Sequence, residues 1–398
     1  MAKKIMILGA SILQLPSIVK AKEMGLKVVV LDFNPNAIGF KEEGIVKEVV
    51  STIDIPAVVE CAKKHKVDGV MTLASDMPMR AVAAVCKELK LPGIDDATAL
   101  RATNKAEMRK ALFEHGVPVP KFFKVSNRKE YENAVKEFKQ SFIVKPADNS
   151  GSRGIFKISD LQDQKTIYEA YDYSRASSRN GDVVVEEYMN GPEVSVETLT
   201  IDGVCHVIQI TDKLTTGAPH FVEMGHTQPT NHPIDIANRI KEVAIAANKA
   251  IGIKNGPSHT EIIVTDEGPK IVELGARLGG DCITTHLVPL STGVNMVECC
   301  IKIALGEKPD ITPKFQKASA IRYLHQHEGK IKKISGVDAA SKVKGIQQIS
   351  IIHGENEEIG EITDSASRMG FVIAQCDTRE EAIKACDQAL NLIKVEMK

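Results

Sequence analysis

The stretch SHTEIIVTDEGPKIVELGARLGGD, residues 258–281, has the pattern of two strands joined by a tight turn. The predicted strands are Ser258–Val264 and Lys270–Leu274. Each arm carries one carboxylate, Glu261 and Glu273. Acids that face each other across a strand pair repel unless a cation lies between them, and magnesium accepts carboxylates together with substrate phosphates. The hairpin is therefore a candidate metal site.

Arg277 lies four residues after Glu273 and is followed by the turn Leu278-Gly279-Gly280-Asp281. The two glycines leave backbone N–H groups accessible beside a fixed positive charge. This turn is therefore a second candidate for binding an anionic group.

A lysine and a glycine-containing loop come at the end of an earlier predicted strand. Residues Ser141–Pro146 form that strand, and Ser150-Gly151-Ser152-Arg153-Gly154 begins five residues after Lys145. The glycines free the backbone to form an anion-binding nest, with hydroxyls and a guanidinium alongside. A flexible hairpin loop explains the same residues equally well.

Two further predicted strands, Val183–Glu187 and Glu193–Ile201, flank the turn Met189-Asn190-Gly191-Pro192. The first strand ends in two acids, Glu186 and Glu187. Such a link can supply backbone donors and acceptors to a purine edge and a carboxylate to a ribose diol. An ordinary strand with a solvated acidic end is the alternative.

The first hundred residues alternate β-branched strands with helical patterns, which predicts a parallel βαβ layout. The predicted elements are strands Lys4–Leu8, Lys27–Leu31 and Val67–Thr72 and helices Leu15–Met24 and Pro56–His65. The turn Gly9-Ala10-Ser11 has one glycine where a dinucleotide fingerprint has three. A nicotinamide cofactor held by Asp32 is therefore disfavoured against a structural turn or one that touches the substrate.

The length of 398 residues predicts two or three domains. The sequence pattern changes near Ala99 and after Pro309, and these positions mark the candidate domain boundaries. Further predicted elements are helix Asn104–His115, strand Val204–Thr211 paired with the strand before it, helix Ala237–Ile251 and a final helix Arg379–Val395.

Composition excludes several classes of protein. Lys and Arg number 51 against 52 Asp and Glu, a net charge of −1 that gives no electrostatic case for a nucleic-acid partner or an acidic membrane. Apolar runs such as Ile5–Ala10 are far shorter than the roughly 18 residues that span a bilayer. No two of the eight cysteines have CxxC spacing. We expect a cytoplasmic protein with free thiols and no nucleic-acid or membrane partner.

Taken in order along the chain, these motifs resemble the ATP-grasp superfamily over nearly the whole sequence. The likeness is greatest to its carboxylate–amine ligases, including amino-acid and dipeptide ligases and carbamoyl-phosphate-synthase-like proteins. The segments that carry this narrower likeness are Gly9-Ala10-Ser11, Gln14-Leu15-Pro16, Asp32-Phe33-Asn34-Pro35 and residues 220–226.

The resemblance implies an α/β and α+β fold with ATP-grasp architecture, similar to the biotin-carboxylase branch. Residues 1–98 would form an N-terminal Rossmann-like parallel sheet. Residues 99–312 would form the two-lobed nucleotide grasp, with a mobile lid at about 120–192. Residues 313–398 would form a small C-terminal α+β domain.

The resemblance also implies roles for individual residues. Lys105 and Lys145 would hold the ATP phosphates. The remaining ATP-binding residues would be the loop Ser150, Gly151, Ser152, Arg153 and Gly154, which closes over the phosphates, the link residues Glu186, Glu187 and Met189 at adenine, and Glu193 at the ribose. Glu261 and Glu273 would bind Mg²⁺, with Mn²⁺ as the alternative metal, and Arg277 would act in catalysis on the phosphoryl group and the acyl phosphate.

One position departs from the family pattern. Many members have asparagine two residues after the second metal acid, where this chain has Gly275. A metal ligand is therefore missing or replaced. The candidate substrate residues, for which a purely structural role is the alternative, are Glu223, His226, His259, Gly279, Gly280 and Asp281.

The implied function is an ATP- and Mg²⁺-dependent ligase that activates a small carboxylic acid as an acyl phosphate and couples it to an amine, releasing ADP and phosphate. Three alternatives stay open: a carboxylase or formate-using enzyme working through carboxyphosphate or formyl phosphate, a nicotinamide-dependent reductase, and a non-catalytic nucleotide-binding protein. The expected partners are small-molecule acids and amines, and a homodimer is compatible with the C-terminal domain.

Overall fold

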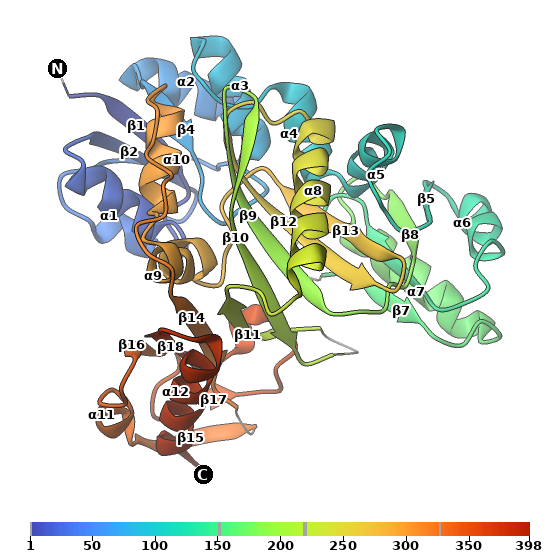
Figure 1. The fold of residues 1–398 in the computed structure, drawn as a ribbon. Helices are drawn as coiled ribbons and strands as arrows, with labels where there is room; N and C mark the ends of the chain where they lie inside the picture. The colour runs from blue at the N-terminus through green and yellow to red at the C-terminus, as the bar shows by residue number, and fades with distance from the viewer. Residues whose placement is uncertain (1, 150–152, 218–220, 326–327) are drawn as a thin grey trace.

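The computed structural model describes residues 2–149, 153–217, 221–325 and 328–398. Figure 1 shows an N-terminal sheet with its helices, a separate lobe around β5–β8, a long central sheet, and a C-terminal region that extends from one end of that sheet. These parts match the ATP-grasp fold class that the sequence predicts.

The N-terminal sheet is parallel, with strand order β3-β2-β1-β4. Its elements are β1 (Lys4–Leu8), α1 (Leu15–Glu23), β2 (Lys27–Asp32), η1 (Ile38–Lys41), β3 (Val46–Val49), α2 (Ile55–His65), β4 (Gly69–Met71) and α3 (Met79–Leu89). The Asp32 carboxylate accepts hydrogen bonds from the backbone N of Ala10 at 2.7 Å and of Asn34 at 2.9 Å. Asp32, at the end of β2, therefore has a structural role in two turns, and this role explains the residue without a bound nucleotide.

Two helices lead from this sheet into the next lobe, α4 (Asp96–Thr103) and α5 (Lys105–Glu114). Asn104 ends α4 and caps α5, because its side chain accepts from the backbone N of Ala106 and of Glu107. This cap fixes Lys105 in the first turn of α5, where its backbone N donates to the carbonyl of Ala147 at 2.6 Å.

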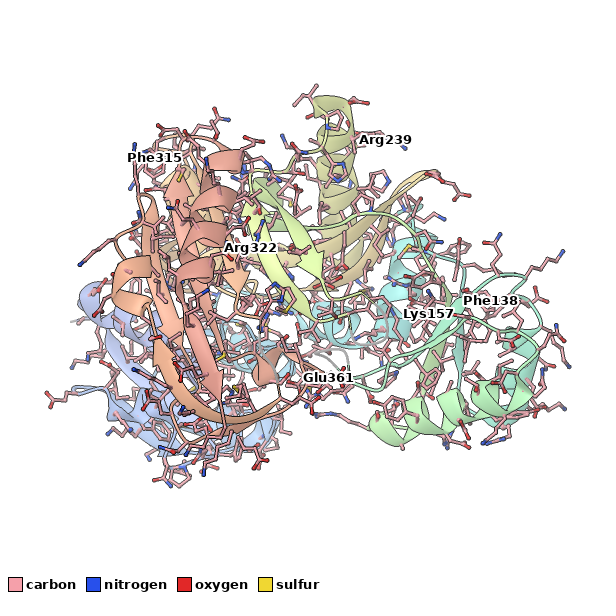
Figure 2. The ribbon with its side chains drawn as sticks, turned by 90° about the horizontal axis from the view of Figure 1, so that it is seen from below. Phe138, Lys157, Arg239, Phe315, Arg322 and Glu361 are labelled. Atoms are coloured by element: carbon pink, nitrogen blue, oxygen red, sulfur yellow. The ribbon has the colours of Figure 1, made fainter. Side chains whose placement is uncertain are left out.

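The separate lobe is a four-stranded antiparallel sheet with order β5-β8-β6-β7. Its elements are β5 (Phe122–Val125), α6 (Arg128–Val135), β6 (Phe142–Pro146), β7 (Phe156–Ile158), α7 (Gln164–Ser177) and β8 (Val183–Glu187). It has its own aromatic core, in which the rings of Phe138 and Phe142 stack at 5.3 Å. Figure 2 shows Phe138 and Lys157 in this lobe, on the opposite side of the molecule from Phe315 and Arg322.

The central sheet has eight strands in the order β13-β12-β9-β10-β11-β14-β18-β16. Its strands are β9 (Glu193–Ile201), β10 (Val204–Thr215), β11 (Glu223–Gln228), β12 (Gly256–Thr265), β13 (Gly268–Gly275), β14 (Ala318–Tyr323), β16 (Ile346–Ile351) and β18 (Gly370–Cys376), and α8 (Ile234–Ile251) packs against β10, β12 and β13. β8 and β9 belong to different sheets although only residues 188–192 separate them. This short link therefore joins the two lobes.

The C-terminal third adds several short elements. They are η2 (Ile283–Leu287), α9 (Val288–Thr292), α10 (Met296–Ala304), β15 (Gly329–Ser335), α11 (Val337–Ala340), β17 (Glu358–Ile359), η3 (Ser365–Ser367), α12 (Arg379–Leu392) and β19 (Lys394–Met397). The final helix expected through Val395 ends at Leu392. The residues after it pair with β15, and this tertiary pairing overrides their helical pattern. The boundary predicted at 312/313 lies between α10 and β14, and the central sheet continues across it.

All eight cysteines are free, as expected. Among the described residues, no single helix has both the length and the apolar composition to cross a membrane. The segments Ile283–Thr292 and Met296–Ala304 meet that test only as a pair, which is bent by 113°.

Candidate active site

Lys145, at the end of β6, belongs to a buried charge cluster. Its Nζ lies 2.6 Å from Oε2 of Glu186, whose Oε1 lies 2.6 Å from Nε of Arg109 on α5. Burial raises the pKa of Glu186, but the charges of Arg109 and Lys145 outweigh burial and lower that pKa to about 2. Burial lowers the pKa of Lys145. Ion pairs through Glu186 thus connect β6, β8 and α5 near the residues predicted to bind ATP.

The sequence analysis did not identify Arg109. It lies four residues after Lys105, so one helical turn places both cations on the same face of α5. That spacing was the available signal. Lys105 itself donates to the Asn149 carbonyl at 2.6 Å and lies 2.8 Å from Oε1 of Glu273.

Glu261 and Glu273 are directly opposite each other in the register of β12 and β13. Each carboxylate is paired with a lysine, so the two acids have cationic partners in this structure without a metal. Lys105 holds Glu273, and Nζ of Lys213 lies 3.1 Å from Oε1 of Glu261.

Lys213, on β10, lies among three acids. Its Nζ is 2.5 Å from Glu193, 3.1 Å from Glu261 and 3.5 Å from Glu223, and its side chain is 4% exposed. Burial lowers the pKa of Lys213, but the three carboxylates raise it well above its ordinary value. Burial raises the pKa of Glu193, whereas the Lys213 charge overcomes burial at Glu261 and holds that pKa well below the usual range.

His259 is buried beside Glu261. Its Nδ1 is 2.6 Å from Oε1 of the fully buried Glu197, and its Nε2 is 3.4 Å from Oε1 of Glu261. Burial lowers the pKa of His259, but Glu197 and Glu261 raise it to about 9, so the ring is charged at neutral pH. A Cβ at Gly279 would lie 2.7 Å from Nδ1, so this close approach requires glycine.

Glu197 was also missed. It follows Glu193 by four positions on β9, and alternation along a strand places both on one face. Glu193 on that face is the residue predicted at the ribose, and Glu197 contacts His259, which lies beside the predicted metal ligand Glu261.

Arg277 forms a two-point ion pair with Asp76, which follows β4 of the N-terminal sheet. Nε lies 2.8 Å from Oδ1, and Nη2 lies 3.1 Å from Oδ2. Burial opposes the charge of Arg277, but Asp76 raises the pKa further above its already high value. A Cβ at Gly275 would lie 2.6 Å from Oδ1 of Asp76. The glycine in the position of the family's asparagine therefore makes room for Asp76.

Asp281 connects the glycine turn to the C-terminal region. Its carboxylate is 2.7 Å and 2.9 Å from two nitrogens of Arg368 and 3.2 Å from Nε2 of His226. Burial raises the pKa of Asp281, but these partners lower it strongly. Arg368 also lies over the ring of Tyr323 at 3.7 Å. The backbone of Asp281 has a φ of 49°, in the left-handed region that non-glycine residues seldom adopt.

The remaining predicted residues lie around this set. Ser150, Gly151 and Ser152 lie outside the described residues. Gly154 is fixed to α7, because its carbonyl accepts from Oγ of Ser174 at 2.7 Å. Arg153 is exposed, Glu187 and the buried Met189 lie in or beside the link between β8 and β9, and Gly280 lies beside Ala74.

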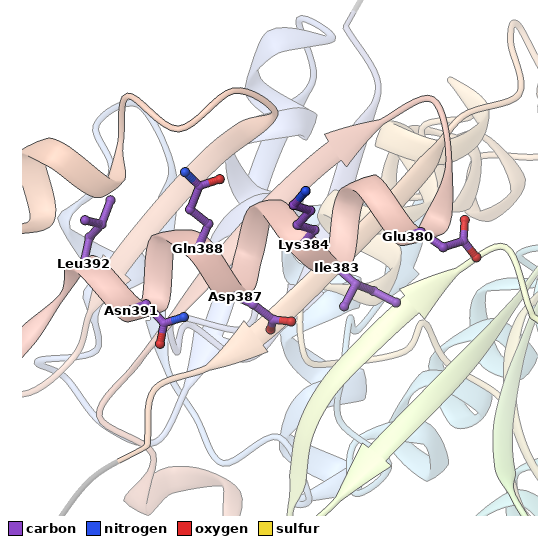
Figure 3. A pocket seen from close by; sticks show the side chains of 7 residues that line it. All are labelled: Glu380, Ile383, Lys384, Asp387, Gln388, Asn391 and Leu392. Atoms are coloured by element: carbon purple, nitrogen blue, oxygen red, sulfur yellow. The ribbon is translucent and has the colours of Figure 1, made fainter.

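A shallow hollow runs along the outer face of α12, lined by residues between Glu380 and Leu392 (Figure 3). It contains none of the predicted site residues. The candidate active site is therefore argued from the charged clusters above and not from this hollow.

The donor set at the hairpin fits magnesium. Carboxylate oxygens from two facing strands are the hard ligands that this ion prefers, and it completes its coordination with water and substrate phosphates. Lys105 and Lys213 are the cations that hold these acids here. The role of Glu261 and Glu273 as metal ligands stays a prediction, as do the ATP-binding roles.

Two family models match the chain. The ATP-grasp domain matches residues 138–285, and the L-amino acid ligase C-terminal domain 2 matches residues 322–398. The L-arginine-specific L-amino acid ligase of Bacillus subtilis is 26% identical over 292 residues, which cover 71% of this chain and 68% of that protein.

Solved structures share the fold. An L-amino acid ligase from Bacillus licheniformis superposes with a TM-score of 0.83 at 23% identity, covering 100% of this chain and 99% of that one. The biotin carboxylase domain of Hydrogenobacter thermophilus 2-oxoglutarate carboxylase, a dimer in complex with MgADP, ADP and bicarbonate, has a TM-score of 0.78 at 17% identity and covers 100% and 91%. The expected architecture is confirmed by these structures.

Proposed function

We infer that this chain, which belongs to the ATP-grasp superfamily, is an ADP-forming ligase that activates a small carboxylic acid and couples it to an amine. One observation carries this inference. Glu261 and Glu273 face each other across the hairpin, Lys213 pairs with the first and Lys105 with the second. Arg277 follows Glu273 by four residues on the same segment.

Activation is needed because a carboxylate is resonance-stabilised and hydroxide is a poor leaving group. Transfer of the γ-phosphoryl group of ATP to a carboxylate oxygen gives an acyl phosphate and ADP. An amine then attacks the acyl carbon, loses a proton, and phosphate leaves as the amide forms. Phosphoryl transfer of this kind depends on positioning and charge neutralisation more than on covalent chemistry by the protein.

Each group of charged residues described above is proposed to serve one step of this reaction. Lys105 and Lys145 are proposed to hold the phosphates, and the link after β8, with Glu193, to hold adenine and ribose. Arg277 is proposed to stabilise charge on the acyl phosphate and on the tetrahedral oxyanion. Magnesium, or manganese in its place, would be held by Glu261 and Glu273 and would neutralise phosphate charge.

We propose amino acids as the acid and the amine. The match to an L-amino acid ligase C-terminal domain and the likeness to an L-arginine-specific ligase support this choice. The residues proposed to contact these substrates are Glu223, His226, His259, Gly279, Gly280 and Asp281. ADP release screened across pairs of amino acids with Mg²⁺ identifies the pair.

A carboxyphosphate or formyl phosphate intermediate is the second candidate, because a neighbour in fold binds bicarbonate. ADP release that requires bicarbonate or formate and no amino acid would favour it. No ADP release with any acid and amine would favour a non-catalytic nucleotide-binding protein.

An isotope experiment tests the central step. With a carboxylate substrate labelled with ¹⁸O in both oxygens, one label should appear in inorganic phosphate, because the acyl phosphate breaks at the acyl carbon. Mass spectrometry of the phosphate reads the result. Formation of AMP and pyrophosphate, or phosphate without label, contradicts the ligase mechanism.

The Lys145→Ala variant tests the nucleotide site. Charge-assisted hydrogen bonds contribute roughly 1.5 to 3 kcal/mol, so ATP binding should weaken by about one to two orders of magnitude in calorimetry. Lys124→Ala is the matched control, because Lys124 lies in the same sheet but is 45% exposed and pairs with Asp182. If folded Lys145→Ala binds ATP as tightly as the control does, Lys145 does not hold the ATP phosphates.

We also propose a cytoplasmic homodimer. The eight free cysteines and the use of ATP support the location, and the dimeric neighbour in fold supports the assembly. Light scattering at assay concentration tests the dimer, and a monomeric mass contradicts it.

A further inference from the structure

A sulfur, a nitrogen and an oxygen ligand meet at the edge of the N-terminal sheet. The Sγ of Cys61, a ring nitrogen of His65 and a carboxylate oxygen of Glu48 all lie within 4.8 Å of one another. None of these residues belongs to the candidate active site. They lie on β3 and α2, whereas the predicted magnesium ligands are on β12 and β13.

Local structure explains why the three converge. Cys61 and His65 are four residues apart on α2, so one helical turn places them on the same face. Glu48 lies on β3, the edge strand of the sheet, and its Oε1 is 2.5 Å from Nε2 of His65. Cys61 is 6% exposed and packs in the core, so the backbone beneath the group is fixed.

Glu48, one of the three ligands, already pairs with a cation. Nζ of Lys64 lies 2.8 Å from the same Oε1 of Glu48, and Lys64 is 63% exposed. An exposed amine can leave that position at little cost, because a surface ion pair contributes only about 0 to 1 kcal/mol.

We propose that Cys61, His65 and Glu48 bind a zinc-type divalent cation, with water in the fourth position. Thiolate, imidazole and carboxylate are the three ligand types that zinc accepts, and a thiolate excludes magnesium as the preferred ion. Metal–ligand bonds of about 2.0 to 2.3 Å place tetrahedral ligands about 3.5 Å apart. The Glu48 oxygen and the His65 nitrogen, which are 2.5 Å apart, therefore need to separate by about 1 Å to admit the ion, and the Cys61 sulfur already lies within 4.8 Å of both. On binding, the Cys61 S–H bond is replaced by an S–metal bond, the proton leaves to the buffer, and Lys64 moves into solvent.

Cobalt reports on this site directly, because a thiolate bound to Co²⁺ gives a charge-transfer absorbance that oxygen ligands do not give. The full chain, prepared with chelator and then freed of it, is titrated with Co²⁺ alone. We expect the band to saturate at one equivalent and to disappear when Zn²⁺ is added. Cobalt bound at Glu261 and Glu273 would not produce the band, so the two sites are distinguishable, and the outcome does not depend on the ligase activity.

Variants assign the ligands. Cys61→Ser should abolish the band, whereas Cys205→Ser, a partly exposed thiol on β10, should leave it unchanged. His65→Gln and Glu48→Gln should each weaken cobalt binding by more than about tenfold, the loss typical even of an outer-shell partner. His65 is near the surface, so its variant gives an answer even if Cys61→Ser does not fold.

Two neighbouring lysines provide a matched pair. Lys64→Ala removes the competing amine and should tighten cobalt binding. Lys63→Ala should not, because Lys63 pairs with Glu88 and does not contact the group. No charge-transfer band in the unaltered protein, a band that survives Cys61→Ser, or full affinity in His65→Gln would each overturn the proposal.

Discussion

Replacing Glu261 or Glu273 by glutamine is expected to abolish turnover. An amide keeps the size of the side chain but loses the negative charge that a divalent cation needs, and the phosphate charge of ATP is then left without its counter-ion. ADP release measured with saturating ATP, acid and amine reads the effect. Glu267→Gln is the matched control, since Glu267 lies in the turn of the same hairpin with its side chain 77% exposed.

The same variants should lower stability. Lys105 and Lys213 are buried, and each loses an ionised partner when its acid becomes an amide. Hydrogen bonds to charged groups contribute about 1.5 to 3 kcal/mol, so the free energy of unfolding should fall by an amount of that order. Full wild-type activity in excess EDTA, or in either folded variant, is incompatible with the metal assignment.

Local patterns were sufficient to predict most of the elements that support the site. The strands at Lys4–Leu8, Val183–Glu187 and Glu193–Ile201 have the predicted bounds, because β-branched runs end at glycine, proline or acidic turns. The facing of Glu261 and Glu273 follows from the hairpin, since turn position fixes register. The order of the motifs along the chain then narrowed the fold class to the ATP-grasp architecture.

The partners of these residues could not be predicted. Asp76 is 201 residues from Arg277, and Lys213 reaches acids from three different strands. No periodicity connects residues so distant, because only tertiary packing brings them together. The predicted end of the last helix was wrong for the same reason, because pairing with β15 decides the conformation of Lys394–Met397.

Arg277→Ala is expected to lower kcat by about two to three orders of magnitude, as loss of an oxyanion-hole donor does. The guanidinium is fixed by two hydrogen bonds to Asp76, so its charge is already positioned before the acyl phosphate forms. An interaction of this kind is strongest in the transition state, and its removal lowers kcat and kcat/KM together while ATP affinity changes little. Arg239→Ala, an exposed arginine on α8 (Figure 2), is the control.

Arg277→Lys separates charge from geometry. Lysine keeps the positive charge but cannot make the planar two-point contact with Asp76, so a loss of kcat comparable with that of Arg277→Ala shows that the fixed orientation is what matters. Asp76→Asn should give a smaller loss of kcat, because the arginine remains but its anionic anchor is gone. If folded Arg277→Ala keeps the kcat of the unaltered chain, the arginine does not act on the reacting groups, and the role of Asp76 as its anchor is lost with it.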